Sequence, residues 1–211
     1  MHFVLKADEL NIFHMGKAIY TILILLVAGS GIVSCNTSFI SKPKGYFDIQ
    51  LPQHEYNTFN EPGYPYSFEY PVYSKISKDS MFFDNQAENP WWINIEFPGL
   101  NGKIFISYKS LKTNNFDTLI NDAYNLSYKH SIKAYSINDS IFNTANNISG
   151  VYFNVGGDAA SASQFYMTDS NKNFIRGALY FEATPNEDSL APVNKHVKED
   201  LLHLINSFKW Q

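Results

Sequence analysis

The spacing of apolar residues along the chain changes between a period of two and a helical period. Every second residue from Tyr64 to Tyr70 is aromatic, which predicts a strand over residues 64–71 with one row of rings. Prolines at both ends of this segment favour an edge position in its sheet. A second alternation covers residues 91–97, and after a Pro-Gly turn residues 103–109 are predicted to return as its hairpin partner.

Weaker patterns flank these strands. Residues 45–52 alternate apolar and polar side chains and predict a short edge strand that ends at Pro52. A loop is expected over residues 54–63, and a polar connection over residues 75–89.

Two segments have apolar residues at helical spacing. The first runs from about Phe116 to His130 and follows two N-cap candidates, Asn114 and Asn115. The second has Pro192 near its first turn and runs to about residue 208. Its predicted buried stripe consists of Val193, Val197, Leu201, Leu204 and Phe208.

Three further strands are predicted between the helices, over residues 151–155, 160–168 and 174–182. Short turns join these strands, which indicates antiparallel pairing. The order of strands, helix, strands and helix predicts an α+β fold with a mainly antiparallel sheet and packed helices. Residues 45–211 are therefore expected to form a single globular domain.

The N-terminal segment has the pattern of an export signal. Lys17 precedes a stretch without charge, which holds the apolar run 22–27 and then small residues. This pattern predicts a signal peptide over residues 1–34, with Met15 as a more ordinary start than Met1.

The segment Ile32-Val33-Ser34-Cys35 resembles the lipobox of bacterial lipoproteins. The resemblance implies that the Cys35 thiol is lipidated, with residues 35–44 as an acylated tether; the alternative is a membrane helix that contains a cysteine. Asn36 follows the cysteine where Asp would retain such a protein in the inner membrane. A lipid-anchored, periplasm-facing protein of the outer membrane is expected, with the outer face of the inner membrane as the alternative.

Composition excludes several classes of protein. The chain has 211 residues, of which 45% are hydrophobic and 16% aromatic, enough for a packed core and too many for a disordered chain. A net charge of −4 and a single arginine, Arg176, argue against nucleic-acid binding. The single cysteine, Cys35, excludes a disulfide within the chain and a zinc site built from cysteines.

Candidate chemistry centres on histidines. His196, His203 and the acidic pair Glu199 and Asp200 share one side of the last helix and could hold a metal. That side is turned away from the buried stripe, so a solvated face is expected instead. His130 lies at the edge of its helix's apolar face, where a hydrogen-bonded boundary histidine is expected.

Other motifs favour structural roles as well. Arg176 alternates with ring-bearing residues and could bind a carboxylate of a partner, but pairing with a buried carboxylate is expected. The ring row 64–70 could form a binding platform, but core packing is expected. Residues 156–158 predict a hairpin turn, and the chain has no Gly-x-Ser-x-Gly motif. No catalytic residue, metal ligand or cofactor is predicted.

Two resemblances follow from longer stretches. Residues 66–71 and the end of the last helix are similar to PsbP/Mog1-type domains, which supports the α+β assignment. The second resemblance rests on seven stretches beyond Cys35, which are 43–47, 51–56, 64–71, 164–170, 174–181, 185–190 and 208–210. Through these stretches the chain resembles the GldD family of gliding-motility lipoproteins nearly from end to end.

The GldD resemblance implies a cell-envelope lipoprotein needed for gliding, working beside other Gld lipoproteins and the type IX secretion machinery. It carries over no catalytic residue, only the lipidated Cys35. A non-enzymatic scaffold or assembly factor is therefore expected. The alternatives are a periplasmic hydrolase or metal-dependent enzyme using His130 or the side with His196 and His203, and a small-ligand-binding lipoprotein using the ring row.

Overall fold

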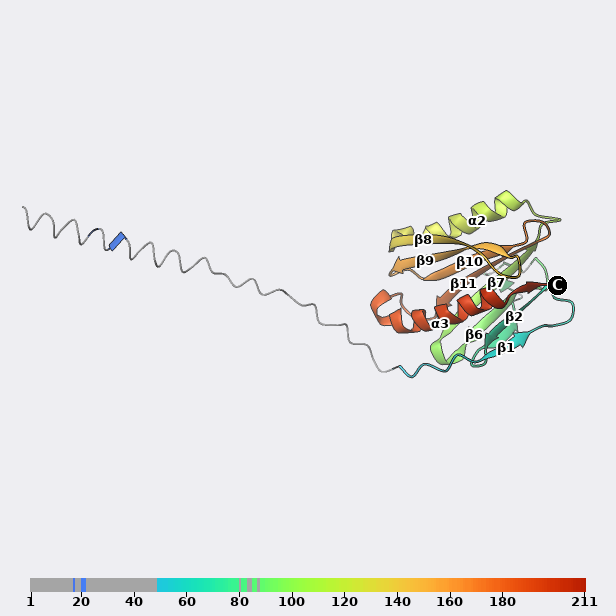
Figure 1. The fold of residues 1–211 in the computed structure, drawn as a ribbon, viewed down its shortest axis with the longest axis horizontal. Coiled ribbons are helices and arrows are strands. Elements are labelled where there is room, and N and C mark those ends of the chain that lie inside the picture. Colours follow the sequence, from blue (N-terminus) through green and yellow to red (C-terminus); the bar gives the residue numbers. More distant parts are fainter. Residues whose placement is uncertain (1–16, 18–19, 22–48, 80, 83–84, 87) are drawn as a thin grey trace, which may run out of the picture. The chain divides into compact units, whose positions relative to one another are not determined.

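A computed structural model describes residues 17, 20–21, 49–79, 81–82, 85–86 and 88–211 (Figure 1). The predicted lipobox, Cys35 and the tether lie outside these residues. The folded part belongs to one compact unit, Tyr46–Gln211. Among the described residues no helix is both long and apolar enough to cross a membrane.

A seven-stranded sheet forms the centre of this unit, and every neighbouring pair in it is antiparallel. This pairing, together with two packed helices, confirms the α+β prediction. The predicted hairpin is present, since β6 pairs with β7. The order across the sheet is β3 (Lys75–Lys78), β6 (Ile93–Phe97), β7 (Gly102–Ser110), β11 (Asn173–Phe181), β10 (Ser163–Thr168), β9 (Ser149–Gly157) and β8 (Ala134–Asn143).

A smaller sheet has the ring-row strand at its centre. Here β2 (Tyr66–Pro71) pairs on one side with β1 (Tyr56–Phe59) and on the other with β12 (Lys209–Trp210). The prediction of an edge strand is therefore wrong. Pro65 precedes β2 and Pro71 is its last residue, so neither proline interrupts the middle of the ladder.

Several predictions about the flanking segments are also wrong. The expected loop 54–63 contains β1, and the expected connection 75–89 contains β3 and the antiparallel pair of β4 (Met81–Phe82) and β5 (Asn85–Gln86). Residues 49–52 form no strand, while the rest of the expected strand 45–52 lies outside the described residues. β8 was not predicted, because its mostly exposed side chains lack a clear alternation.

Both predicted long helices are present, but α3 begins earlier than predicted, so Pro192 lies inside the helix and not near its first turn. α2 (Phe116–Tyr128) begins after Asn115, whose side chain accepts a hydrogen bond from the Thr118 N–H at 3.0 Å. α3 (Glu187–Ser207) begins after Asn186, whose side chain caps it in the same way. Short 3-10 turns, η1 (Pro98–Leu100) and η2 (Lys129–Ile132), follow β6 and α2.

The helices pack on opposite faces of the seven-stranded sheet. α2 contacts a small core on one face, with Leu119 and Ala123 against side chains of β9, β10 and β11. α3 and the smaller sheet enclose a larger core on the other face. The predicted stripe of α3 is buried at all five positions, which confirms the helical reading of that segment. Figure 1 shows α2 and α3 as separate helices beside the strands.

Candidate functional site

The ring row packs in the core, as the sequence predicted. Tyr66 and Phe68 are fully buried, and both rings lie against Phe208 at the end of α3, with centroids 5.7 Å and 6.2 Å away. Tyr64 and Tyr70 are partly buried at the ends of the row. These rings join β2 to α3 and do not form an open platform.

The histidine-bearing side of α3 is buried at His196 and Asp200, which contradicts the predicted solvated face there, while Glu199 is exposed and His203 is partly buried. His196 is 8% exposed and Asp200 is 1% exposed. The physical reason is that the segment before β1, expected to be loop, lies against this side of the helix and brings His54 and Tyr56 onto it. Other parts of the chain therefore cover α3 on two sides. The apolar stripe in the sequence predicts only one of them.

The Asp200 carboxylate is the centre of a cluster of polar side chains. One of its oxygens accepts a hydrogen bond from His54 Nδ1 at 2.6 Å and another from the Tyr56 hydroxyl at 3.0 Å. The other oxygen accepts one from the Tyr73 hydroxyl. The ring of His196 stacks on that of His54, with centroids 4.1 Å apart. We call these five residues the Asp200 cluster.

The protonation of the cluster follows from its burial. Burial lowers the pKa of His196, and the neighbouring His54 lowers it further, while the carboxylates of Asp200 and Glu199 act in the opposite direction. The His196 Nε2 atom is buried and has no hydrogen-bond partner in the described part of the chain. Burial and the hydrogen bond to Asp200 raise the pKa of Tyr56 to about 12, so its hydroxyl stays a donor.

The same residues include a set of atoms that could ligate a metal. One nitrogen each from His54 and His196 and one oxygen of Asp200 lie within 4.8 Å of one another, and two histidines with a carboxylate are a zinc-type donor set. The shortest of these contacts, 2.6 Å between His54 and Asp200, is a hydrogen bond. Both carboxylate oxygens already accept hydrogen bonds from tyrosines. The arrangement therefore fits a structural contact that holds α3 against the segment with His54 and β1.

A second contact between α3 and the smaller sheet lies one helical turn further along the helix. His203 Nε2 pairs with a carboxylate oxygen of Glu69 at 2.6 Å, and the ring of Tyr56 stacks on His203 with centroids 3.6 Å apart. His203 and Glu69 are only partly buried, so this pair contributes less to stability than the Asp200 contacts.

His130 is far from this group in the fold. It lies half-buried in η2, near the ring of Tyr180.

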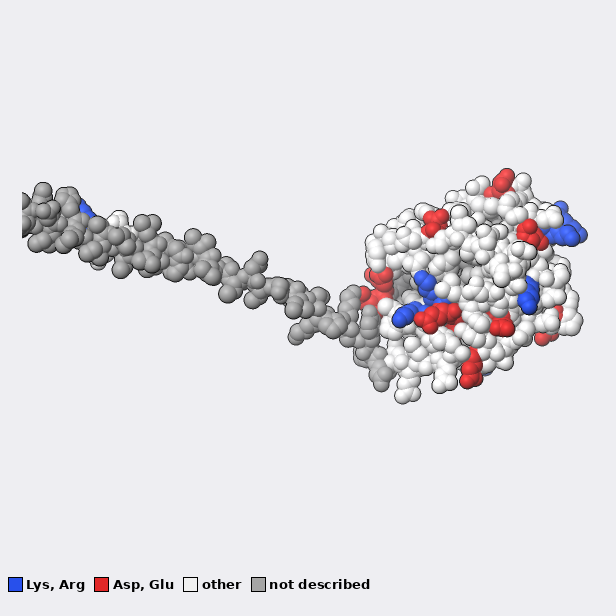
Figure 2. All heavy atoms as spheres, viewed as in Figure 1, with Lys and Arg blue, Asp and Glu red and all other residues white. Residues whose placement is uncertain are grey.

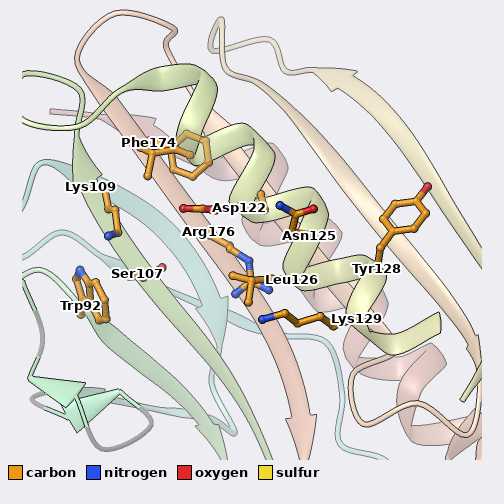
Figure 3. Close-up of a pocket in the computed structure, with 12 residues that line it drawn as sticks. Trp92, Ser107, Lys109, Asp122, Asn125, Leu126, Tyr128, Lys129, Phe174 and Arg176 are labelled. Atoms are coloured by element: carbon orange, nitrogen blue, oxygen red, sulfur yellow. The ribbon is translucent and has the colours of Figure 1, made fainter. Parts of the chain in front are cut away.

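A separate cavity of about 760 Å³ lies on the α2 face of the sheet (Figure 3). α2 packs over β9, β10 and β11, and the cavity opens beside it over β7. Its wall and floor combine apolar groups with cationic ones. The lining includes Trp92, Ser107, Lys109, Leu126, Phe174 and Arg176.

Arg176 does not have the buried carboxylate partner that the sequence led us to expect. Its Nη2 donates to the side-chain oxygen of Gln164 at 2.5 Å, and no described carboxylate pairs with the guanidinium. Gln164 is fully buried, and its Nε2 has no acceptor in the described part of the chain. Burial lowers the pKa of Arg176, while the neighbouring Tyr180 acts in the opposite direction.

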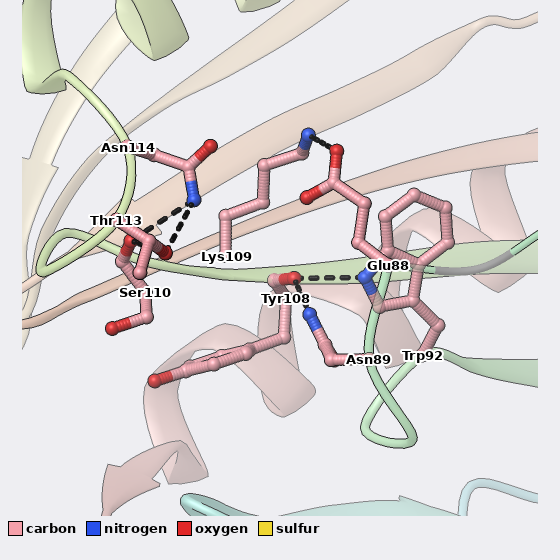
Figure 4. A network of polar contacts seen from close by, with 8 residues as sticks. All are labelled: Glu88, Asn89, Trp92, Tyr108, Lys109, Ser110, Thr113 and Asn114. Atoms are coloured by element: carbon pink, nitrogen blue, oxygen red, sulfur yellow. Dashed lines mark hydrogen bonds and ion pairs between the residues drawn. The ribbon is translucent and has the colours of Figure 1, made fainter.

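A network of hydrogen bonds fixes one wall of the cavity (Figure 4). The indole N–H of Trp92 donates to the Tyr108 carbonyl at 2.8 Å, and the Asn89 side chain donates to the same oxygen at 2.9 Å. Lys109 forms an ion pair with Glu88 beside the Trp92 ring. The wall is therefore held in place before any ligand binds.

Comparison with known families decides where this chain belongs. The family model for the gliding motility lipoprotein GldD matches residues 36–210, which includes the whole folded unit described above apart from its last residue. The chain belongs to the GldD family. GldD proteins are gliding-motility lipoproteins, so the chain is a lipoprotein associated with a membrane and with a motility system.

Other comparisons add little to the GldD assignment. No curated protein matches the chain. Among solved structures, the chain is similar to the cyanobacterial PsbP (CyanoP) of Synechocystis sp. PCC 6803. The two share 10% sequence identity with a TM-score of 0.47, over 77% of this chain and 96% of the other.

Proposed function

We propose that this GldD-family chain is an outer-membrane lipoprotein, anchored by acyl chains on Cys35 and facing the periplasm. Residues 1–34 are its signal peptide and residues 35–44 its tether. The folded domain acts without catalysis, as a scaffold or assembly factor beside other Gld lipoproteins and the type IX secretion machinery. The observation that carries the proposal is the family match, which begins directly after Cys35 and extends through the folded unit.

The Asp200 cluster supports a role without catalysis. A general acid or base must be free to exchange a proton with a bound substrate. Here the carboxylate of Asp200 is buried and accepts hydrogen bonds from His54, Tyr56 and Tyr73. These groups join distant parts of the chain to α3, so their main effect is on the stability of the fold.

The exposed edge of the main sheet supports a docking role. β8 is the last strand of the sheet, and Ile141 on it is 79% exposed. Ile132, in the turn before β8, is 88% exposed. Exposed edge strands with apolar side chains readily contact other chains. On the face drawn in Figure 2, acidic and basic groups interleave without a large patch of one sign, so apolar contacts suit this docking better than long-range attraction.

Site-specific crosslinking in intact cells tests the docking proposal. A photoreactive residue at Ile141 should yield crosslinks to Gld lipoproteins or type IX secretion components, identified by mass spectrometry. The same residue at Glu61, an exposed loop position, is the matched control and should yield fewer such crosslinks. Equal yields of these components from both positions, or their absence from the Ile141 crosslinks, would count against docking at this edge.

The metal-dependent enzyme is a second candidate function, because His54, His196 and Asp200 bring three donor atoms together. It is tested by measuring the metal content of the purified full chain after exposure to zinc and dialysis. A stoichiometric bound ion that is lost in the variant His196→Gln would support this candidate. A metal-free chain whose strain still glides would support the scaffold.

A further inference from the structure

The cavity beside α2 contains a positive charge that forms no ion pair with any carboxylate of the described residues. Arg176 reaches it from β11, and its described hydrogen-bond acceptor is the neutral side chain of Gln164. A guanidinium has five N–H donors, and a partly buried charge is favoured to find an anion. The unpartnered Nε2 of Gln164 shows that even this amide contact leaves a buried donor unsatisfied.

None of the described groups around the guanidinium forms an ion pair with it. His130 is held neutral, since burial and then the charge of Arg176 lower its pKa. Tyr180 stays protonated, because burial raises its pKa more than Arg176 lowers it. Lys109 is paired with Glu88, and Lys129 adds a further cation to the lining. Asp122 is an exposed acid in the same lining, and it forms no ion pair with Arg176.

The cavity also has the size and surface of a ligand site. Its volume of about 760 Å³ lies in the range of small-molecule pockets. Trp92, Phe174 and Leu126 contribute apolar groups to the lining of the same cavity (Figure 3). Arg binds carboxylates through two parallel hydrogen bonds. A ligand that matches both the guanidinium and the apolar lining therefore carries a carboxylate next to an apolar group.

We propose that this cavity binds a short segment of a partner polypeptide, with a carboxylate of that segment bound to Arg176 and an adjacent apolar side chain against Trp92. The choice of a polypeptide rests on the proposed docking function. It is supported by polar groups in the lining, Ser107 and Asn125, which can pair with peptide N–H and C=O groups. A fatty acid would leave these groups unpaired.

Binding of defined probes to the purified full chain in detergent tests the proposal by calorimetry. The probe is the dipeptide N-acetyl-Leu-Phe with a free carboxylate, and its matched control is the same dipeptide with a C-terminal amide. We expect the free acid to bind at least about tenfold more tightly than the amide. Decanoate serves as the amphiphile probe, and we expect it to bind more weakly than the dipeptide acid.

Three variants locate the site. Arg176→Lys keeps the charge but loses the paired donors, and should weaken the dipeptide acid about tenfold. Leu126→Glu places a carboxylate in the cavity at a position that is 38% exposed, and should abolish binding without unfolding the chain. Leu202→Glu is the matched control, because Leu202 is 39% exposed and lies on α3, away from this cavity.

Each contrary result has a clear meaning. Equal binding of acid and amide, unchanged binding in Leu126→Glu, or no binding at millimolar concentration would overturn the carboxylate site. Tighter binding of decanoate would overturn the polypeptide occupant. The calorimetry does not depend on gliding. The cavity proposal can therefore fail while loss of gliding in a strain that carries Cys35→Ala still supports the proposed lipid anchor. The two failures are thereby distinguishable.

Discussion

The carboxylate of Asp200 accepts a hydrogen bond from His54 Nδ1 at 2.6 Å, although 146 positions separate the two residues. This contact joins the segment that follows the predicted tether to the last helix. Tyr56 and Tyr73 donate to the same carboxylate, so one buried group holds three distant parts of the chain. Removing its charge should therefore weaken the fold as a whole.

The variant Asp200→Asn tests this role of the carboxylate. Asparagine keeps the shape but offers a neutral acceptor and an amide N–H that opposes the hydroxyl donors, which leaves buried groups unpaired. We expect the free energy of unfolding to fall by roughly 2–3 kcal/mol, measured by urea titration of the full chain. Glu61→Gln, an exposed carboxylate in a loop, should change it by less than about 0.5 kcal/mol. An equal fall in the free energy of unfolding in both variants would contradict a stabilising role of the Asp200 carboxylate.

Stability should also depend on pH through His196. Its pKa in the folded chain is below the ordinary value of 6.5, so the unfolded chain binds more protons between these two values. The contribution of neutral His196 is complete above 6.5 and is lost as the pH falls through its folded pKa. The free energy of unfolding should therefore decrease on acidification below 6.5.

The variant His196→Gln isolates this contribution. It should show a shallower loss of stability on acidification than the parent, whatever its stability at neutral pH. His130, whose pKa is also lowered, contributes with the same sign, so His130→Gln should flatten the curve independently. An unchanged pH dependence in His196→Gln would show that this histidine is not held neutral by the fold.

Close approach of two strands makes Gly150 sensitive to substitution. A Cβ atom there would lie 2.1 Å from the Tyr166 carbonyl oxygen and 2.6 Å from the Phe142 ring. Gly150→Ala should push β9 and β10 apart and destabilise the chain by roughly 2–3 kcal/mol. Gly99→Ala is the control, because nothing lies within 4 Å of its added Cβ. Thermal unfolding should separate the two variants by several degrees.

Features set by neighbouring residues could be predicted from the sequence. The ring row of β2, the hairpin of β6 and β7, and the stripe of α3 each follow from a local repeat that the fold preserves. The Asn115 cap is equally local, because its partner lies three positions away. In these places the short-range pattern and the long-range packing agree.

Features set by long-range pairing could not be predicted. The burial of His196 and Asp200 depends on the β1 segment, which pairs with β2 and carries His54 onto α3. The helical repeat in the sequence predicts how far each residue of α3 lies from the apolar stripe. It does not predict that a distant segment of the chain covers a second side of the helix. The predicted carboxylate partner of Arg176 was wrong, because its contact with Gln164 depends on the register of β10 and β11.

The central claim is that the domain acts in gliding while anchored by a lipid at Cys35, and the variant Cys35→Ala tests it most directly. Cells that express this variant at the level of the parent chain should be fractionated and their gliding on a surface recorded. The account predicts that no mature, lipid-modified protein is found in the membrane fraction and that gliding is lost. Normal gliding, with the variant recovered as soluble protein or as mature protein in the membrane fraction, would contradict it.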